Sequence, residues 1–296
     1  MGINSGLSEY HNLLHNKGEI TIDNVTVNGG YFNVGGVLSY NSTTNTTFNN
    51  MKNEGSLTIT KTSATAGHVD VGGVLGCNNT ATIITGEVSN SGVVTCDMTA
   101  TTTGKWRGIG GVIGYYYSNT LNMSGATLTN SGDVICKGTY DVVQLGGIIG
   151  KINKTSFTYG SMKNSGNVTL DKDVNITDWS NTYVGGIAGY TAIAINGARC
   201  FCDIIALNGA KVGFITGTPY DDTIKSTNCH IGGNVSTMLN ATGDGPDWTP
   251  IDAWEYLTYI YGGEISKDEA TASKLGWLEK NIDDTPRDHD SKPIEF

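Results

Sequence analysis

The sequence predicts an all-β solenoid, similar to a parallel β-helix, of about six coils of roughly 37 residues with three short strands each, followed by a small helical C-terminal cap. Three observations predict this fold. Two short motifs alternate along the chain at a nearly constant spacing, and the residues after one of them alternate between apolar and polar. The composition adds to this, because 41 glycines, five prolines and 16% charged residues suit short strands joined by tight turns.

The first motif is Asn-x-Gly followed by a short strand, and it occurs at 16–22, 53–59, 90–96, 130–136 and 164–170. The second and fourth residues after each glycine are apolar. These pairs are Ile20/Ile22, Leu57/Ile59, Val94/Cys96, Val134/Cys136 and Val168/Leu170. The residue between them is threonine in four copies and isoleucine in one, so the motif predicts a strand with one core face and one wet face.

The second motif is a Gly-Gly block flanked by aliphatic residues, at 34–39, 71–76, 109–114, 145–150 and 184–189, with a degraded sixth copy at 212–217. Successive copies begin 37, 38, 36, 39 and 28 residues apart, so insertions fall between fixed elements, as surface loops on a rigid scaffold do. Because glycine permits positive φ and close backbone approach, we expect a sharp corner at each block.

A third segment, such as 48–52 or 126–129, leads into each Asn-x-Gly turn and supplies the third strand of a unit. Such a unit cannot bury its apolar face alone, so neighbours must stack in register about 4.8 Å apart. Stacking predicts a hydrogen-bonded ladder of the turn asparagines. It also brings Cys96 next to Cys136, where the thiols either pack as small apolar groups or lie close enough for a disulfide.

The chain divides into a solenoid domain at 1–243 and a C-terminal segment at 244–296. Residues 249–262 have a threonine N-cap, Pro250 at the first helical position and Gly262 after the end, which predicts a helix, although their tyrosine and isoleucine content also suits a strand. A capping box at 266–269 opens a second helix to about Asn281. We expect this helical hairpin to cover the last coil and 283–290 to form an acidic tail.

Charge and hydropathy exclude several classes of partner. The net charge of −10 and pI near 4.8 argue against nucleic acid, which requires a basic surface. No segment is long and apolar enough to predict a transmembrane helix. The first residues lack the basic and apolar regions of a signal peptide, so we expect an extracellular chain whose signal peptide has been removed. Because the chain begins partway through a repeat, we also expect a fragment of a longer protein, or a mature chain whose partner covers that end.

No catalytic or metal-binding constellation emerges from the sequence, and no cofactor is expected. The five histidines have no ligand or triad spacing: His11, His15, His68, His230 and His289. Cys200-Phe201-Cys202 is weak evidence for a metal site, and Cys77 has no evident partner. Calcium is the alternative, because the acidic sequences at 221–222, 243–247 and 283–284 offer the oxygen ligands that it prefers, although none matches a known calcium loop.

The Asn-x-Gly strand paired with the Val-Gly-Gly-Ile-x-Gly block resembles the GLUG-type repeats of bacterial cell-surface and adhesin-like proteins, over about residues 10–217. This sequence writes Gly-Gly-Val-Leu or Gly-Gly-Ile-Ile where the family has Gly-Leu-x-Gly. The resemblance implies a β-solenoid that projects from the cell surface, often beside other domains that include peptidases. It transfers no metalloprotease activity, because the chain lacks His-Glu-x-x-His.

Aromatic residues in or beside the variable inserts are the candidate ligand contacts: Trp106, Tyr115, Tyr116, Tyr117, Trp179 and Tyr183. Such rings stack on sugar faces or anchor a protein partner, unless they pack under a loop. We therefore expect a non-enzymatic extracellular surface module, adhesin-like or a structural spacer, that binds a host glycan or protein or adjoins further domains of a longer chain. The alternatives are a carbohydrate-active β-helix enzyme, for which the repeats offer only sparse carboxylates at non-equivalent positions, and a phage or fimbrial fibre component.

Overall fold

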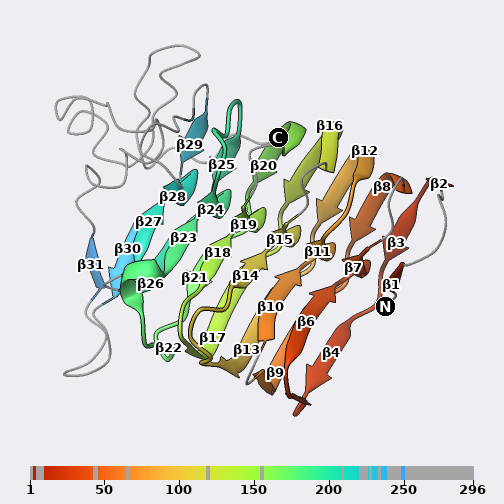
Figure 1. Ribbon diagram of the computed structural model, residues 1–296. Helices are drawn as coiled ribbons and strands as arrows, with labels where there is room; N and C mark the ends of the chain where they lie inside the picture. Colours follow the sequence, from red (N-terminus) through yellow and green to blue (C-terminus); the bar gives the residue numbers. More distant parts are fainter. Residues whose placement is uncertain are drawn as a thin grey trace.

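The computed structural model describes residues 3–4, 10–42, 46–64, 67–117, 121–153, 157–207, 210–219, 226, 229–232, 235–238 and 248–250. These residues form an all-β solenoid of about five turns, so the predicted fold class is confirmed. Figure 1 shows the strands of successive coils side by side, in rows that run from the N-terminal coils in red to the C-terminal coils in blue. The one helical element among the described residues is the short 3₁₀ turn η1 (Trp179–Asn181).

Four sheets, here named A to D, run along the solenoid, and each coil passes through them in the order D, A, B, C. Sheet D holds β6 (Gly30–Gly35), β10 (Gly67–Gly72), β14 (Arg107–Gly110), β18 (Gln144–Gly146), β23 (Tyr183–Gly185) and β27 (Lys211–Gly213). Sheet A holds β1 (Ile3–Asn4), β7 (Leu38–Asn41), β11 (Leu75–Asn78), β15 (Ile113–Tyr116), β19 (Ile149–Ile152), β24 (Ala188–Thr191) and β28 (Thr216–Pro219).

The Asn-x-Gly half of the repeat forms the other two sheets. Sheet B holds β2 (Tyr10–His11), β3 (Leu14–Asn16), β8 (Thr46–Asn53), β12 (Thr82–Asn90), β16 (Leu121–Asn130), β20 (Thr158–Asn164), β25 (Arg199–Phe201) and β29 (His230–Gly232). Sheet C holds β4 (Ile20–Asp23), β5 (Thr26–Val27), β9 (Leu57–Ala64), β13 (Val94–Ala100), β17 (Val134–Tyr140), β21 (Val168–Leu170), β22 (Asn175–Ile176), β26 (Ile204–Leu207), β30 (Val235–Met238) and β31 (Trp248–Pro250).

Each coil has four strands, and the prediction of three is wrong. The Gly-Gly block is not one element, because its glycines turn the chain from a strand of sheet D into a strand of sheet A, as from β10 to β11. The sixth, degraded block adds β27 and β28 to the stack. A complete sixth coil is not confirmed, since residues 220–225 and 227–228 lie outside the described part.

In-register stacking is confirmed at the side-chain level. Asn53 donates to Asn90 at 2.7 Å, Asn90 to Asn130 at 2.8 Å and Asn130 to Asn164 at 2.9 Å, which is the predicted asparagine ladder. Each of these four asparagines also donates to the carbonyl two residues on, so the ladder closes every Asn-x-Gly turn. The predicted core positions of the strands are fully buried from Leu57 onward, whereas Ile20 and Ile22 are half-buried in the first coil.

Close backbone approach is the reason for the glycines, and the expected positive φ is absent from the Gly-Gly blocks. A Cβ on Gly110 would overlap the carbonyl oxygen of Ile113, and one on Gly111 would overlap the carbonyl oxygen of Gly147 in the next coil. A Cβ on Gly114, the third glycine, would run into the backbone at Val71. Sheets A and D therefore touch backbone to backbone near the corner, which only glycine allows.

The cysteines behave as apolar core residues. In the described part all six are free and buried, and Cys96 and Cys136 are direct register partners without a disulfide. The Sγ atoms of Cys200 and Cys202 lie 3.4 Å apart, and Asn164 of the ladder donates to Cys202. The sequence left two possibilities for Cys96 and Cys136, apolar packing or a disulfide, and the structure shows apolar packing.

The C-terminal segment is described at 248–250 alone, where β31 pairs antiparallel with β30. These residues are a strand at the point where the sequence predicts the first helix to begin. The remainder of the expected helical cap, the acidic tail and the three acidic sequences considered for calcium lie outside the described residues. Where the structure describes the chain, it contains no helix of the length and hydropathy needed to cross a membrane.

Candidate functional site: an aromatic groove

A groove follows the solenoid axis where sheets D and A diverge from their glycine contact. The outward columns of the two sheets face each other there, since a Cβ on Gly108 of sheet D would lie 3.4 Å from the Cβ of Tyr115 in sheet A. Side chains in these columns and on the inserts beside them line two neighbouring hollows. The two hollows together are called the aromatic groove below. Trp106 borders both hollows.

The first hollow, of about 180 Å³, is mostly aromatic. It is lined by Tyr31, Tyr40, His68, Cys77, Asn79, Trp106, Tyr115 and Tyr117. Tyr31 stacks on His68 with ring centroids 5.1 Å apart, and the backbone amide of Trp106 donates to His68 Nδ1 at 3.1 Å. Tyr31, Trp106 and Tyr117 are 68%, 40% and 47% exposed, so three of the seven exposed large hydrophobic side chains of the described chain gather here. Such a concentration is typical of a binding surface.

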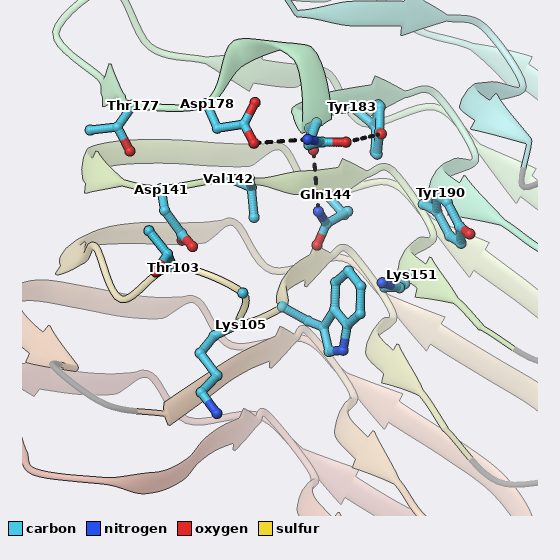
Figure 2. A pocket seen from close by; sticks show the side chains of 13 residues that line it. Thr103, Lys105, Asp141, Val142, Gln144, Lys151, Thr177, Asp178, Tyr183 and Tyr190 are labelled. Atoms are coloured by element: carbon cyan, nitrogen blue, oxygen red, sulfur yellow. Dashed lines mark hydrogen bonds between the residues drawn. The ribbon is translucent and has the colours of Figure 1, made fainter.

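The second hollow, of about 490 Å³, mixes aromatic rings with charged and amide groups. Figure 2 shows its lining: Thr103, Gly104, Lys105, Trp106, Asp141, Val142, Gln144, Lys151, Thr177, Asp178, Asn181, Tyr183 and Tyr190. Asn181 connects its wall, because it donates to Asp178 at 2.8 Å, accepts from the Tyr183 hydroxyl at 3.0 Å and receives Gln144 Nε2 at its carbonyl at 3.4 Å. The polar groups on this side are thus preorganised by one another.

Arg107 fixes the insert that carries Trp106. Its side chain is fully buried, at the register position where β10 places Val69 in the core. The guanidinium donates to the carbonyls of Ala100, Trp106 and Thr102 at 3.0–3.1 Å and pairs with Asp141 at 3.4 Å. Because one planar fork satisfies two carbonyls of the insert and the carbonyl at the end of β13, it holds the 101–106 segment against the coil and sets the place of the indole.

Two further charged groups are buried under the groove. Asp70 is fully buried, neither of its carboxyl oxygens has a hydrogen-bond partner in the described part, and burial raises its pKa well above the ordinary value. Lys151 is 1% exposed, and burial lowers its pKa to about 7, against the opposing charge of Asp70. Buried groups with shifted pKa values at a cleft are typical of functional sites, although ion pairs inside a fold shift them too.

The structure brings four of the six predicted contact residues to the groove. Trp106, Tyr115 and Tyr117 line the first hollow, and Trp106 and Tyr183 line the second. Tyr116 is a correction: side chains alternate along a strand, so it points into the core and packs on Phe157 at 5.1 Å. Trp179 is half-buried against the core and lines neither of these two hollows, so its predicted role stays a prediction.

The residues that sequence reasoning missed are Asp70, Arg107, Gln144 and Lys151. Arg107 and Lys151 are charged residues in columns of mainly apolar and aromatic residues, whereas Asp70 and Gln144 share one outward column of sheet D with Asn33, Gly108 and Tyr183. Lys151, for example, occupies the position of Tyr115 and Tyr190, and Asp70 that of Gly108. A column-by-column comparison of the repeats, beyond the glycines and asparagines, carries this signal. Among the described residues, no group of three or more His, Cys, Asp or Glu side chains is placed to hold a metal ion.

Comparison with known proteins gives no matching family model, no matching curated protein and no matching solved structure.

Proposed function

We propose that this β-solenoid is an extracellular, non-catalytic module of a bacterial surface protein, related to the GLUG-type repeats, and that it binds an oligosaccharide along the aromatic groove. One observation carries the proposal: aromatic side chains from coils far apart in sequence, from Tyr31 to Tyr190, line two hollows that meet at Trp106. A β-solenoid is compatible with both binding and catalysis, and the groove supports binding.

The chemistry of the lining supports a sugar. The flat rings of Trp106, Tyr31 and Tyr117 offer apolar faces on which the C–H face of a pyranose stacks, while their exposure leaves room for it. Amides at the walls, such as Asn79 and Gln144, supply hydrogen-bond partners for hydroxyl groups. Tyr31 and Tyr190 are separated by four coil steps, or about 20 Å at 4.8 Å per step, which favours a chain of sugars over a single ring.

Replacing Trp106 by alanine tests the proposal. We expect Trp106→Ala to weaken binding of a groove-bound oligosaccharide at least about tenfold in titration calorimetry, because this ring borders both hollows. Trp179→Ala is the matched control, since this tryptophan lies outside both hollows, and we expect the folded variant to bind as the wild type does. An oligosaccharide panel without any binder, or a binder indifferent to Trp106, contradicts the proposal.

A second function is favoured by one observation in the second hollow. Asp141 is buried and burial raises its pKa, while Asp178 lies in the next coil, with its amide donating to the Asp141 carbonyl at 2.8 Å. Glycosidases use two carboxyl groups in different environments as acid and base or nucleophile, and these two carboxyl groups lie on adjacent coils. Release of reducing ends from a polysaccharide, lost in Asp141→Asn and Asp178→Asn, would establish the enzyme in place of the binding module.

A further inference from the structure

We infer that the second hollow recognises an anionic sugar, and that Lys151 binds the carboxylate or sulfate group. This inference rests on the proposed function and narrows the ligand class from oligosaccharides in general to acidic ones.

The fold does not require a lysine at position 151 in the wall of the hollow. It projects from β19 into the aromatic groove, where Nζ lies 2.8 Å from the Trp106 ring centroid, 4.8 Å from that of Tyr190 and 5.9 Å from that of Tyr115. Figure 2 shows Lys151 beside Tyr190 in the lining of the hollow. The neighbouring coils have tyrosine at this position, so an aromatic residue satisfies the packing here without a buried amine.

The amine has no hydrogen-bond acceptor or ion-pair partner among the described residues. The carboxyl groups around it are already engaged or hard to ionise: Asp141 pairs with Arg107, Asp178 accepts from Asn181, and burial keeps the pKa of Asp70 well above its ordinary value. A buried ammonium normally needs a counter-charge. An anionic ligand in the hollow provides one.

Lys105 adds a second cation to the same lining, on the insert that Arg107 holds in place. Both lysines stand out in a chain of net charge −10, which repels anions at long range. Selectivity for an acidic sugar therefore has to come from local cations. Lys151 covers one face of the Trp106 ring and lines the second hollow together with it, so a sugar bound in that hollow lies next to the amine.

The pH dependence of ligand binding provides a second test of this inference. An anion is held by the protonated amine, and Lys151 has a pKa of about 7 without ligand. Affinity should therefore be highest below about pH 7 and fall as the pH rises, because the free protein then loses the proton. The other titratable or charged groups around Lys151 are Asp70, Lys105, Arg107, Cys77, Tyr115, His68, Asp141, Asp178, Tyr183 and Tyr190. Burial keeps Cys77 and Tyr115 neutral, and ionisation of Asp70 on raising the pH would weaken anion binding in the same direction.

The experiment compares matched acidic and neutral sugars on the full chain by titration calorimetry. One arm uses trigalacturonate and its methyl ester, and the other uses a sulfated chondroitin disaccharide and its unsulfated form, so that carboxylate and sulfate are distinguished. We expect the acidic member of at least one pair to bind about tenfold or more tightly, and this preference to shrink between about pH 6 and about pH 9. Lys151→Met should abolish both the preference and its pH dependence. Lys137→Met, on sheet C at the surface, is the control and should change neither.

The outcomes separate this inference from the proposed function. Equal binding of acidic and neutral sugars, or a preference that survives in Lys151→Met, overturns the role of Lys151 and leaves an aromatic glycan groove. Absence of binding to any oligosaccharide overturns both. Circular dichroism of Lys151→Met excludes misfolding as the cause, and the fold should tolerate methionine, which keeps the apolar stem and removes a buried charge.

Discussion

Asp70 is the residue whose chemistry departs furthest from that of an ordinary side chain of its kind. It lies in the outward column of sheet D at the base of the aromatic groove, fully buried, with Cys77 beside it. Burial favours the neutral acid and outweighs the nearby charges of Arg107 and Lys151, so the folded protein retains a proton that the unfolded chain loses near its ordinary pKa of 3.8. The contribution of Asp70 to stability is therefore largest below that value and declines as the pH rises.

We predict that Asp70→Asn removes this decline. Between about pH 4 and about pH 6, the free energy of unfolding of the wild type should fall relative to the variant by up to about 1.4 kcal/mol per pH unit, since one proton separates the folded and unfolded states. Urea denaturation at several pH values measures the difference. A difference independent of pH would show that the folded carboxyl is ionised.

At the scale of the elements, the Gly-Gly corner decides how sheets A and D meet and therefore how the groove opens. We predict that Gly110→Ala costs at least about 3 kcal/mol, because the new Cβ would overlap the carbonyls of Ile113 and Ile148 and the amide of Gly150, and backbone on three sides cannot move away. Gly125→Ala is the control: its Cβ would meet only the methyl of Thr85 at 3.4 Å. Equal midpoints for the two variants in thermal unfolding would contradict this account of the motif.

The elements that could be predicted from sequence are those whose residues repeat for a local reason. Asn90 and its equivalents identify both the turn and the ladder, because one side chain type serves every coil, and Val94 and Cys96 show the inward face of the strand that follows. The split of each Gly-Gly block into two strands could not be predicted in this way. Close approach between two sheets is a tertiary effect, and in the sequence it produces the same paired glycines as a tight turn does.

For the same reason, only part of the candidate site could be predicted from the sequence. An aromatic residue beside an insert, such as Trp106, can be recognised in the sequence as a candidate contact. Lys151 and Asp70 are candidates because they are buried, and their burial depends on the neighbouring coils and cannot be inferred from one repeat. Tyr116 was misplaced because three consecutive tyrosines look alike until strand alternation places one of them inside.

At the scale of the whole molecule, stability is shared between neighbouring coils and not across a single globular core. Each described strand of the parallel sheets pairs with the equivalent strand of the preceding or following coil, so strand pairing joins each coil to its immediate neighbours, and the groove depends on several of these pairings at once. The third to fifth coils carry Trp106, Lys151 and Tyr183, so the second hollow of the groove belongs to the interior of the stack.

This arrangement predicts a gradient of protection in amide hydrogen exchange. Strand β13 is paired on both sides, by β9 and β17, and its inward residues Val94 and Cys96 are fully buried. Strand β4 is paired only with β9 in the described part, and Ile20 and Ile22 are half-buried. We expect peptides from β13 to exchange at least about 100-fold more slowly than those from β4, because opening an end coil breaks one interface and opening an inner coil breaks two. Mass spectrometry of the intact chain measures both peptides in one experiment. Equal protection would mean that the first coil is covered by another surface, such as a second copy of the chain, and dilution should then restore the gradient.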